Sequence, residues 1–280
     1  MQCTLKAPSR ISGIALHTGV RAHLTLRPAP AGAGIVVRRV DLPGQPEIPA
    51  HASRVIDVQR ATTIAVGDAK VHTVEHVLAA LYGCGVDNAV IEMDSAEPPV
   101  VDGSSAPFVA LIEAAGIVVQ DLPRRIYRVP RPVMVEAGGT TLVIWPDDQY
   151  RISCTVQYGV NSMDTQYATV TMGDGVFARE LSAARTFCRY DEIEPLMIAG
   201  LIRGGSLDNA VILKDDAIIC KDGLRFPDEQ VRHKMLDIVG DLSLVGCRLL
   251  GHVIAIRPGH PTNVALAQAI LATMEEPVAV

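Results

Sequence analysis

The sequence predicts an α+β protein built from two domains of similar topology, residues 1–122 and 123–280. Short segments in which apolar and polar residues alternate are interspersed with a few longer segments that have helical spacing. Between residues 121 and 132, prolines and charged residues interrupt this periodicity, so we place the domain boundary there. The pentapeptide DNAVI occurs at residues 87–91 and again at 208–212, which fits a duplicated unit.

The first domain is expected to begin with strands and to contain two helices. Alternating apolar residues, such as Leu24 and Leu26 on one face, predict strands at residues 2–7, 20–28, 34–40, 62–66 and 87–93. A loop is expected between the first two strands. Helical spacing predicts helices at 71–81 and 107–115, the second with Ser104 or Ser105 at its start.

The second domain shows the same mixture of patterns. Strands are expected at residues 132–136, 140–146, 150–157, 167–172 and 252–257. Helices are expected at residues 174–184, 231–241 and 261–274.

The composition excludes several classes of function. The 280 residues carry a formal net charge of −6 and contain no basic run, so we expect no nucleic-acid partner. No apolar segment approaches the roughly 18–20 residues that a membrane-spanning helix needs. The N-terminus lacks the pattern of a signal peptide, and the six cysteines are scattered, as is typical of reduced thiols. We therefore expect a cytoplasmic protein.

The helix predicted at residues 231–241 carries the first candidate metal ligands. His233, Asp237 and Asp241 recur every four residues, so they lie on one face of the helix. An imidazole and a carboxylate one turn apart can bind one metal ion. Catalytic zinc usually takes three protein ligands and leaves one position for water, so at least one ligand would come from elsewhere.

The helix predicted at residues 71–81 offers two competing arrangements. Glu75 and His76 are adjacent, and a ligand histidine next to a carboxylate is the recurring arrangement in zinc hydrolases. In the first arrangement, His72 and His76 both bind the metal, as in an inverted-zincin peptidase. In the second, His76 joins His233 and Asp237. A third hypothesis is a protein without enzymatic activity in which these side chains serve only the fold.

Several further segments are spread across nearly the whole chain: GIALHTG (13–19), LRPAP (26–30), TVEH (73–76), DGSSAPF (102–108), ARTF (184–187), DGLRF (222–226) and VRHKMLDIVGD (231–241). Taken together and in this order, they resemble the UDP-3-O-acyl-N-acetylglucosamine deacetylase (LpxC) family. The resemblance implies a zinc-dependent hydrolase that removes the N-acetyl group of a UDP-sugar in lipid A biosynthesis. It also implies helices sandwiched between two mainly antiparallel sheets, with the active site at the domain interface.

The resemblance also assigns roles to individual residues. It implies that His76, His233 and Asp237 bind the zinc ion and that Glu75 is the general base, which argues against His72 as a ligand. For the catalytic groups of the second domain, it implies that Thr186 helps to stabilise the oxyanion, that His260 is a charged catalytic histidine and that Asp241 is the carboxylate partner of this histidine.

Substrate contacts follow from the same resemblance. Lys234 is expected to bind the diphosphate, and Tyr158 and Phe187 to contact the substrate, a small molecule. The family has a His-Pro pair after the residue that corresponds to Tyr158, whereas this chain has Gly159-Val160-Asn161. An insert near residues 187–207, apolar between Glu194 and Ile202, is expected to form the passage for the acyl chain. We expect the protein to be a monomer.

Overall fold

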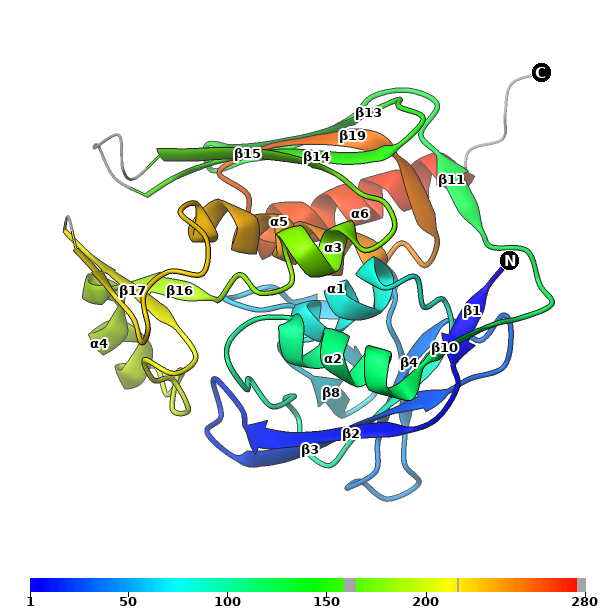
Figure 1. Ribbon diagram of the computed structural model, residues 1–280, viewed down its shortest axis with the longest axis horizontal. Coiled ribbons are helices and arrows are strands. Elements are labelled where there is room, and N and C mark those ends of the chain that lie inside the picture. Colours follow the sequence, from blue (N-terminus) through cyan, green and yellow to red (C-terminus); the bar gives the residue numbers. More distant parts are fainter. Residues whose placement is uncertain (159–164, 216, 276–280) are drawn as a thin grey trace.

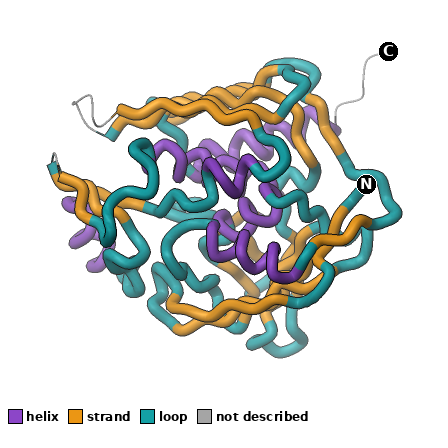
Figure 2. Tube along the Cα trace, in the orientation of Figure 1, coloured by secondary structure: helices purple, strands orange, loops and turns teal. Residues whose placement is uncertain are grey.

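Two β-sheets enclose a layer of helices in the computed structural model, which describes residues 1–158, 165–215 and 217–275. Figure 1 shows one sheet along the top of the molecule and the other along the bottom. Figure 2 shows the helices between the two sheets. The predicted fold class, α+β with mainly antiparallel sheets around the helices, is confirmed.

The first sheet has the strand order β2-β3-β9-β4-β5. Its strands are Ser9–Ile14, Arg21–Pro28, Ala89–Met93, Ile35–Arg39 and Glu47–Pro49. Only the pair of β4 and β9 is parallel. Leu24 and Leu26 are fully buried, as the alternating pattern predicts, because one face of this sheet packs against the helices.

The second sheet has the order β12-β13-β19-β14-β15 and the same senses of pairing, with β14 and β19 parallel. Its strands are Val133–Ala137, Thr140–Trp145, Arg248–Ile256, Tyr150–Gln157 and Thr165–Thr171, and β11 (Ile126–Arg128) also pairs with β19. The two sheets therefore share one strand order, while the duplication itself stays a prediction.

Three smaller sheets complete the β-structure of the described residues. They are β1 (Cys3–Leu5) with β10 (Ile117–Val119), β6 (Val55–Asp57) with β7 (Thr63–Val66) and β8 (Ala69–Val71), and β16 (Phe187–Arg189) with β17 (Val211–Lys214) and β18 (Ala217–Ile219). The last of these, together with α4 (Tyr190–Ile198), lies at one end of the molecule, at the left of Figure 1.

The helices of the layer between the sheets are α1 (Glu75–Gly83), α2 (Ala106–Ala115), α3 (Val176–Glu180), α5 (Glu229–Ser243) and α6 (His260–Glu275). Helices α1 and α5 come from different halves of the chain and pack directly on each other. At Gly240 of α5, an added Cβ atom would lie 2.2 Å from the carbonyl oxygen of Glu75. Only glycine permits this close approach, which brings the two candidate ligand helices together.

Several expectations about local structure were wrong. Residues Ser9–Ile14 form β2 where a loop was expected, and β11 lies within the predicted boundary segment. Helix α1 begins at Glu75 and not near residue 71, because the chain turns between β8 and α1, where Thr73 has a φ of 55°. The helix expected at 174–184 is shorter, Val176–Glu180.

The two copies of the pentapeptide DNAVI do not lie in equivalent places in the two halves of the chain. The first copy runs into β9, the central strand of the first sheet, whereas the second copy runs into β17 of a small sheet. The strand in the place equivalent to β9 is β19. The two copies therefore occupy different places in the fold.

Among the described residues, none of the helices combines the length and the apolar character that spanning a membrane requires.

Candidate metal centre and active site

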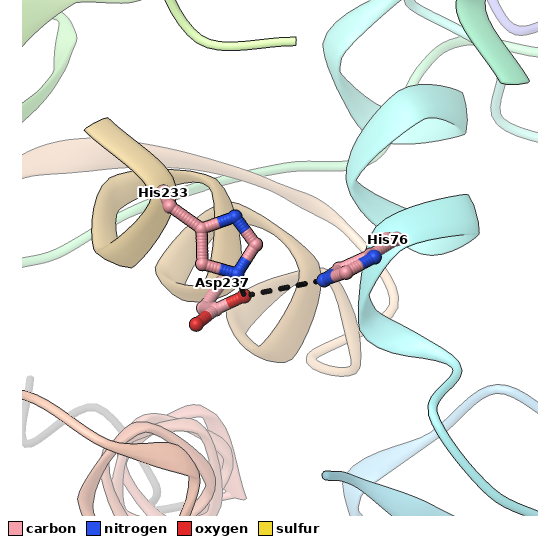
Figure 3. A group of neighbouring side chains, drawn as sticks. All are labelled: His76, His233 and Asp237. Carbon is pink, nitrogen blue, oxygen red and sulfur yellow. Dashed lines mark ion pairs between the residues drawn. The ribbon is translucent and has the colours of Figure 1, made fainter. Parts of the chain in front are cut away.

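His76, His233 and Asp237 form a compact, buried group. Figure 3 shows His76 on α1 facing His233 and Asp237, which lie one turn apart on α5. One potential ligand atom from each residue lies within 4.8 Å of the others. The Nε2 atoms of His76 and His233 lie 3.8 Å and 3.4 Å from Oδ1 of Asp237. The three side chains could therefore hold one metal ion between the two halves of the chain.

The protonation and hydrogen bonding of these residues fit a metal. Nδ1 of His233 donates to the carbonyl oxygen of Ala184 at 3.0 Å, which leaves Nε2 with a free lone pair toward the group. Burial, together with nearby His233, lowers the pKa of His76 to about 3, so His76 is neutral, as a ligand must be. Oδ1 of Asp237 is buried and has no hydrogen-bond partner. A bound cation would satisfy this oxygen.

Lys234 holds the other oxygen of the same carboxylate. Its Nζ donates to Oδ2 of Asp237 at 2.8 Å and lies 5.4 Å from the ring centroid of Phe187. Burial works against the charge of Lys234, but Asp237 outweighs burial, so the pKa of Lys234 stands above its ordinary value. Lys234 therefore provides a permanent positive charge beside the group.

Glu75 lies next to His76 at the first position of α1 and is 2% exposed. Its Oε2 accepts a hydrogen bond from the backbone N–H of Thr62 at 3.1 Å. Burial raises the pKa of Glu75 to about 7, against the opposing charge of His260. A carboxylate with this pKa can both accept and release a proton near neutral pH.

His260 and Asp241 form a second buried pair beside this carboxylate. Nδ1 of His260 lies 2.8 Å from Oδ2 of Asp241, and its Nε2 lies 3.7 Å from Oε1 of Glu75. Burial lowers the pKa of His260, but Asp241 and Glu75 outweigh burial and raise it to about 9. His260 is therefore protonated at neutral pH. The structure places Asp241 as its partner and not within the metal-binding group.

His72 lies outside the metal-binding group. Nδ1 of His72 is 2.9 Å from the hydroxyl of Thr63, and His72 precedes α1 instead of lying on it. A histidine and a second histidine four residues apart share a helical face only if both lie in the helix. The structure therefore favours the arrangement in which His76 joins His233 and Asp237 over the one in which it joins His72.

A cavity of about 380 Å³ opens over these groups. Two of the three predicted substrate-binding residues, Phe187 and Lys234, line it, as does Thr186, whereas Tyr158 does not. The backbone N–H of Thr186 donates to the carbonyl oxygen of Gly103 at 2.8 Å, which anchors the Thr186 loop to the first half of the chain. The cavity therefore collects Glu75, His260, Thr186 and two of the substrate-binding candidates in one space, while Asp241 lies behind it as the partner of His260.

A second cavity of about 360 Å³ adjoins the first, because Leu16, His17, Arg60, Thr186 and Phe187 line both. The rest of its lining is largely apolar and comes from residues 188–212: Ile193, Leu196, Met197, Ile202, Leu207, Ala210 and Ile212. The insert predicted near residues 187–207 is thus the wall of an apolar cavity, with β17 as a further part of it.

The structure brings Tyr158 to Phe187, whose ring centroid lies 5.0 Å from that of Tyr158 in an edge-to-face arrangement. Phe187 in turn lies 6.0 Å from the ring of His233. The departure from the family pattern at Gly159-Val160-Asn161 lies outside the described residues.

Two residues of the site were missed by the sequence analysis. Thr62 donates its hydroxyl to Asp241 at 2.6 Å, and the amide of Asn263 donates to the same carboxylate at 2.9 Å. No motif marks either residue, since Thr62 precedes a strand and Asn263 lies within a helix. Only the packing of α5 against α6 and the β7 segment reveals them.

Comparison with known proteins places the chain in a family. Residues 2–272 match the family model described as UDP-3-O-acyl N-acetylglycosamine deacetylase. The UDP-3-O-acyl-N-acetylglucosamine deacetylase of Citrifermentans bemidjiense is 47% identical over 270 residues, covering 96% of this chain and 88% of the relative. The proteins of the same name from Myxococcus xanthus and Chlamydia muridarum are 44% and 45% identical, covering 96% and 98% of this chain and 86% and 96% of theirs. The chain therefore belongs to the UDP-3-O-acyl-N-acetylglycosamine deacetylase family.

Proposed function

We propose that this protein hydrolyses the N-acetyl group of UDP-3-O-acyl-N-acetylglucosamine, with a zinc ion held by His76, His233 and Asp237, and that it acts in lipid A biosynthesis. The observation that carries the proposal is the unpartnered Oδ1 of Asp237, buried between two histidines and beside a carboxylate whose pKa is raised. The substrate is the one that the names of the relatives state.

Zinc suits two neutral imidazoles and a carboxylate and, when bound, supplies a positive charge that lowers the pKa of water and polarises a carbonyl group. The residues around it would do the rest. In hydrolysis, water adds to the carbonyl carbon of the acetyl group, the C–N bond breaks, and acetate and a free amine leave. One proton has to be removed from the water and one has to be given to the amine.

Glu75 is the group proposed to remove the proton. Its Oε2 is held by the N–H of Thr62, so Oε1 is the oxygen that we propose takes the proton. A carboxylate of ordinary pKa is too weak a base to take a proton from water. Burial raises the pKa of Glu75 to about 7, which makes this carboxylate a stronger base.

His260 is the group proposed to protonate the amine. It is charged at neutral pH, and its Nδ1 is held by Asp241, so Nε2 is the atom that faces the cavity. Before the proton moves, the positive charge of His260 stabilises the oxyanion. We propose that the hydroxyl of Thr186 also stabilises the oxyanion.

The remaining lining supports the choice of substrate. The fixed charge of Lys234 suits a diphosphate, and Phe187, on which Tyr158 packs edge-to-face, offers aromatic surface beside it. The apolar cavity suits an acyl chain, since it begins at residues that also line the catalytic cavity. The domain limits 1–122 and 123–280 and the monomeric state remain predictions.

The proposed function is tested by incubating purified protein with UDP-3-O-acyl-N-acetylglucosamine and measuring acetate together with the free amine product. We expect both products in equal amounts, and about one metal ion per chain. Removal of the metal by a chelator should stop the reaction, and added zinc should restore it. Acetate release that persists in fully metal-free protein would contradict the proposal.

Replacing Leu196 by aspartate is expected to weaken binding of substrates with a long acyl chain. Leu196 lies on α4, is 8% exposed and lines the apolar cavity, where a carboxylate would oppose burial of methylene groups. We expect KM to rise about tenfold or more for the long-chain substrate and to change little for one with a short acyl chain.

Ile198 provides the matched control, because it lies on the same helix but is 80% exposed and does not line this cavity. The variant Ile198→Asp should leave both KM values near those of the wild type. If the two variants raise KM equally, or if Leu196→Asp raises KM equally for both substrates, the cavity does not bind the acyl chain.

A further inference from the structure

Thr62 contacts both the proposed base, Glu75, and the carboxylate partner of the proposed acid, Asp241. It immediately precedes β7 and is fully buried. Its backbone N–H donates to Oε2 of Glu75 at 3.1 Å, and its hydroxyl lies 2.6 Å from Oδ1 of Asp241. The hydroxyl is also 3.4 Å from Nδ1 of His260. One residue of the first half of the chain thus joins the proposed base on α1 to the carboxylate partner of the proposed acid.

The chemistry of the partners sets the direction of the hydroxyl bond. A carboxylate can only accept, so the Thr62 hydroxyl donates its hydrogen to Oδ1 of Asp241. The other oxygen of Asp241, Oδ2, already accepts from His260 at 2.8 Å and from Asn263 at 2.9 Å. Thr62 is therefore the donor that holds the oxygen which these two residues leave open, and its loss would free the carboxylate to turn.

From this geometry we propose that the Thr62 hydroxyl is a positioning group for the reaction, which holds Asp241, and through it His260, in the orientation that proton transfer to the leaving amine requires. The inference rests on the proposed function. Thr62 acts through Asp241 and does not line the catalytic cavity, so it is not a catalytic residue.

The hydroxyl also moderates the strength of the acid. A donor on Asp241 stabilises the negative charge of this carboxylate, which weakens its hold on the proton of His260. Without the hydroxyl, the pKa of His260 should rise and His260 should become a weaker acid. The titratable groups that surround His260 are Glu75 and His76 on α1, His233, Asp237 and Asp241 on α5, and His17 on the loop before β3.

The test compares Thr62→Val with Thr62→Ser in the metal-loaded protein. Valine keeps the shape and the backbone N–H but lacks the hydroxyl, whereas serine keeps the hydroxyl. We expect Thr62→Val to lower kcat about tenfold or more and to leave KM within about twofold, and Thr62→Ser to retain most of the activity. The alkaline limb of the kcat profile should move to higher pH in Thr62→Val only.

Thr63→Val is the matched control. Thr63 is the next residue, is 2% exposed, and bonds through its hydroxyl to His72, which lies outside the proposed machinery. Its kcat should stay near that of the wild type. Equal losses in the two valine variants, an unshifted alkaline limb in Thr62→Val, or a change in KM alone would overturn the proposed role.

Two further outcomes have a defined meaning. If Thr62→Val does not fold, as judged by thermal unfolding, Thr62→Ser is compared with Thr62→Ala, since both side chains are smaller than threonine and only serine has the hydroxyl. Equal activity of these two variants would overturn the inference. An inactive, metal-loaded wild type contradicts the proposed function, whereas an active wild type with an equally active Thr62→Val contradicts only the role of Thr62.

Discussion

Replacing His233 by alanine is expected to remove the metal from the purified protein and to lower acetate release by about a thousandfold or more. His233 is 2% exposed, and its Nε2 lies 3.4 Å from the unpartnered Oδ1 of Asp237. Without this imidazole, only His76 and Asp237 remain of the group, too few for a catalytic zinc site. The measurements are metal content per chain and acetate release on the same samples.

The control is His72→Ala, which removes an imidazole that lies close to α1 but outside the metal-binding group. We expect this variant to keep about one metal ion per chain. Loss of metal from His72→Ala, with metal retained in His233→Ala, would mean that His72 and His76 form the site. Such a result would support the peptidase arrangement and contradict the proposed deacetylase mechanism.

Replacing Glu75 by glutamine should leave the metal in place and lower kcat by about 10²–10⁴-fold. Glutamine has nearly the shape of glutamate, and its oxygen can still accept the N–H of Thr62. It cannot accept a proton from water at neutral pH. Since Glu75 is not a member of the metal-binding group, metal content should equal that of the wild type.

The comparison of kcat with KM decides the role of Glu75. A base acts on the transition state, so kcat should fall while KM changes little. Turnover near that of the wild type would exclude Glu75 as the base. A variant that loses both metal and activity would instead show that Glu75 supports the ligands and does not act chemically.

Much of the candidate site could be predicted from the sequence because helical spacing is local. His233 and Asp237 lie one turn apart in any straight helix, and the structure confirms that they lie together. Spacing could not separate Asp241 as a ligand from Asp241 as the partner of His260. That distinction depends on α6, which begins at His260 and brings this residue to Asp241.

The wrong predictions arose because local sequence patterns do not show which distant segments a residue contacts. Ser9–Ile14 contains Ser12 and Gly13, which favour loops, yet it forms β2 because β3 provides a complete row of antiparallel partners. The repeated pentapeptide is a local match that says nothing about the place of a strand in a sheet. The order shared by the two large sheets is visible only in the pairing of strands far apart in the sequence.

The sequence by itself determined the class of fold, the approximate positions of the longer helices and of most strands of the two large sheets, and which side chains share a helical face. These follow from the rise and periodicity of a single element and need no knowledge of its neighbours. The tertiary structure decided between the two arrangements of His76 in favour of the one that the resemblance implies, and it alone revealed that Thr62 holds Asp241. The first depends on the crossing of α1 with α5 at Gly240 and the second on the packing of the segment before β7 against α5, and no local signal sets either.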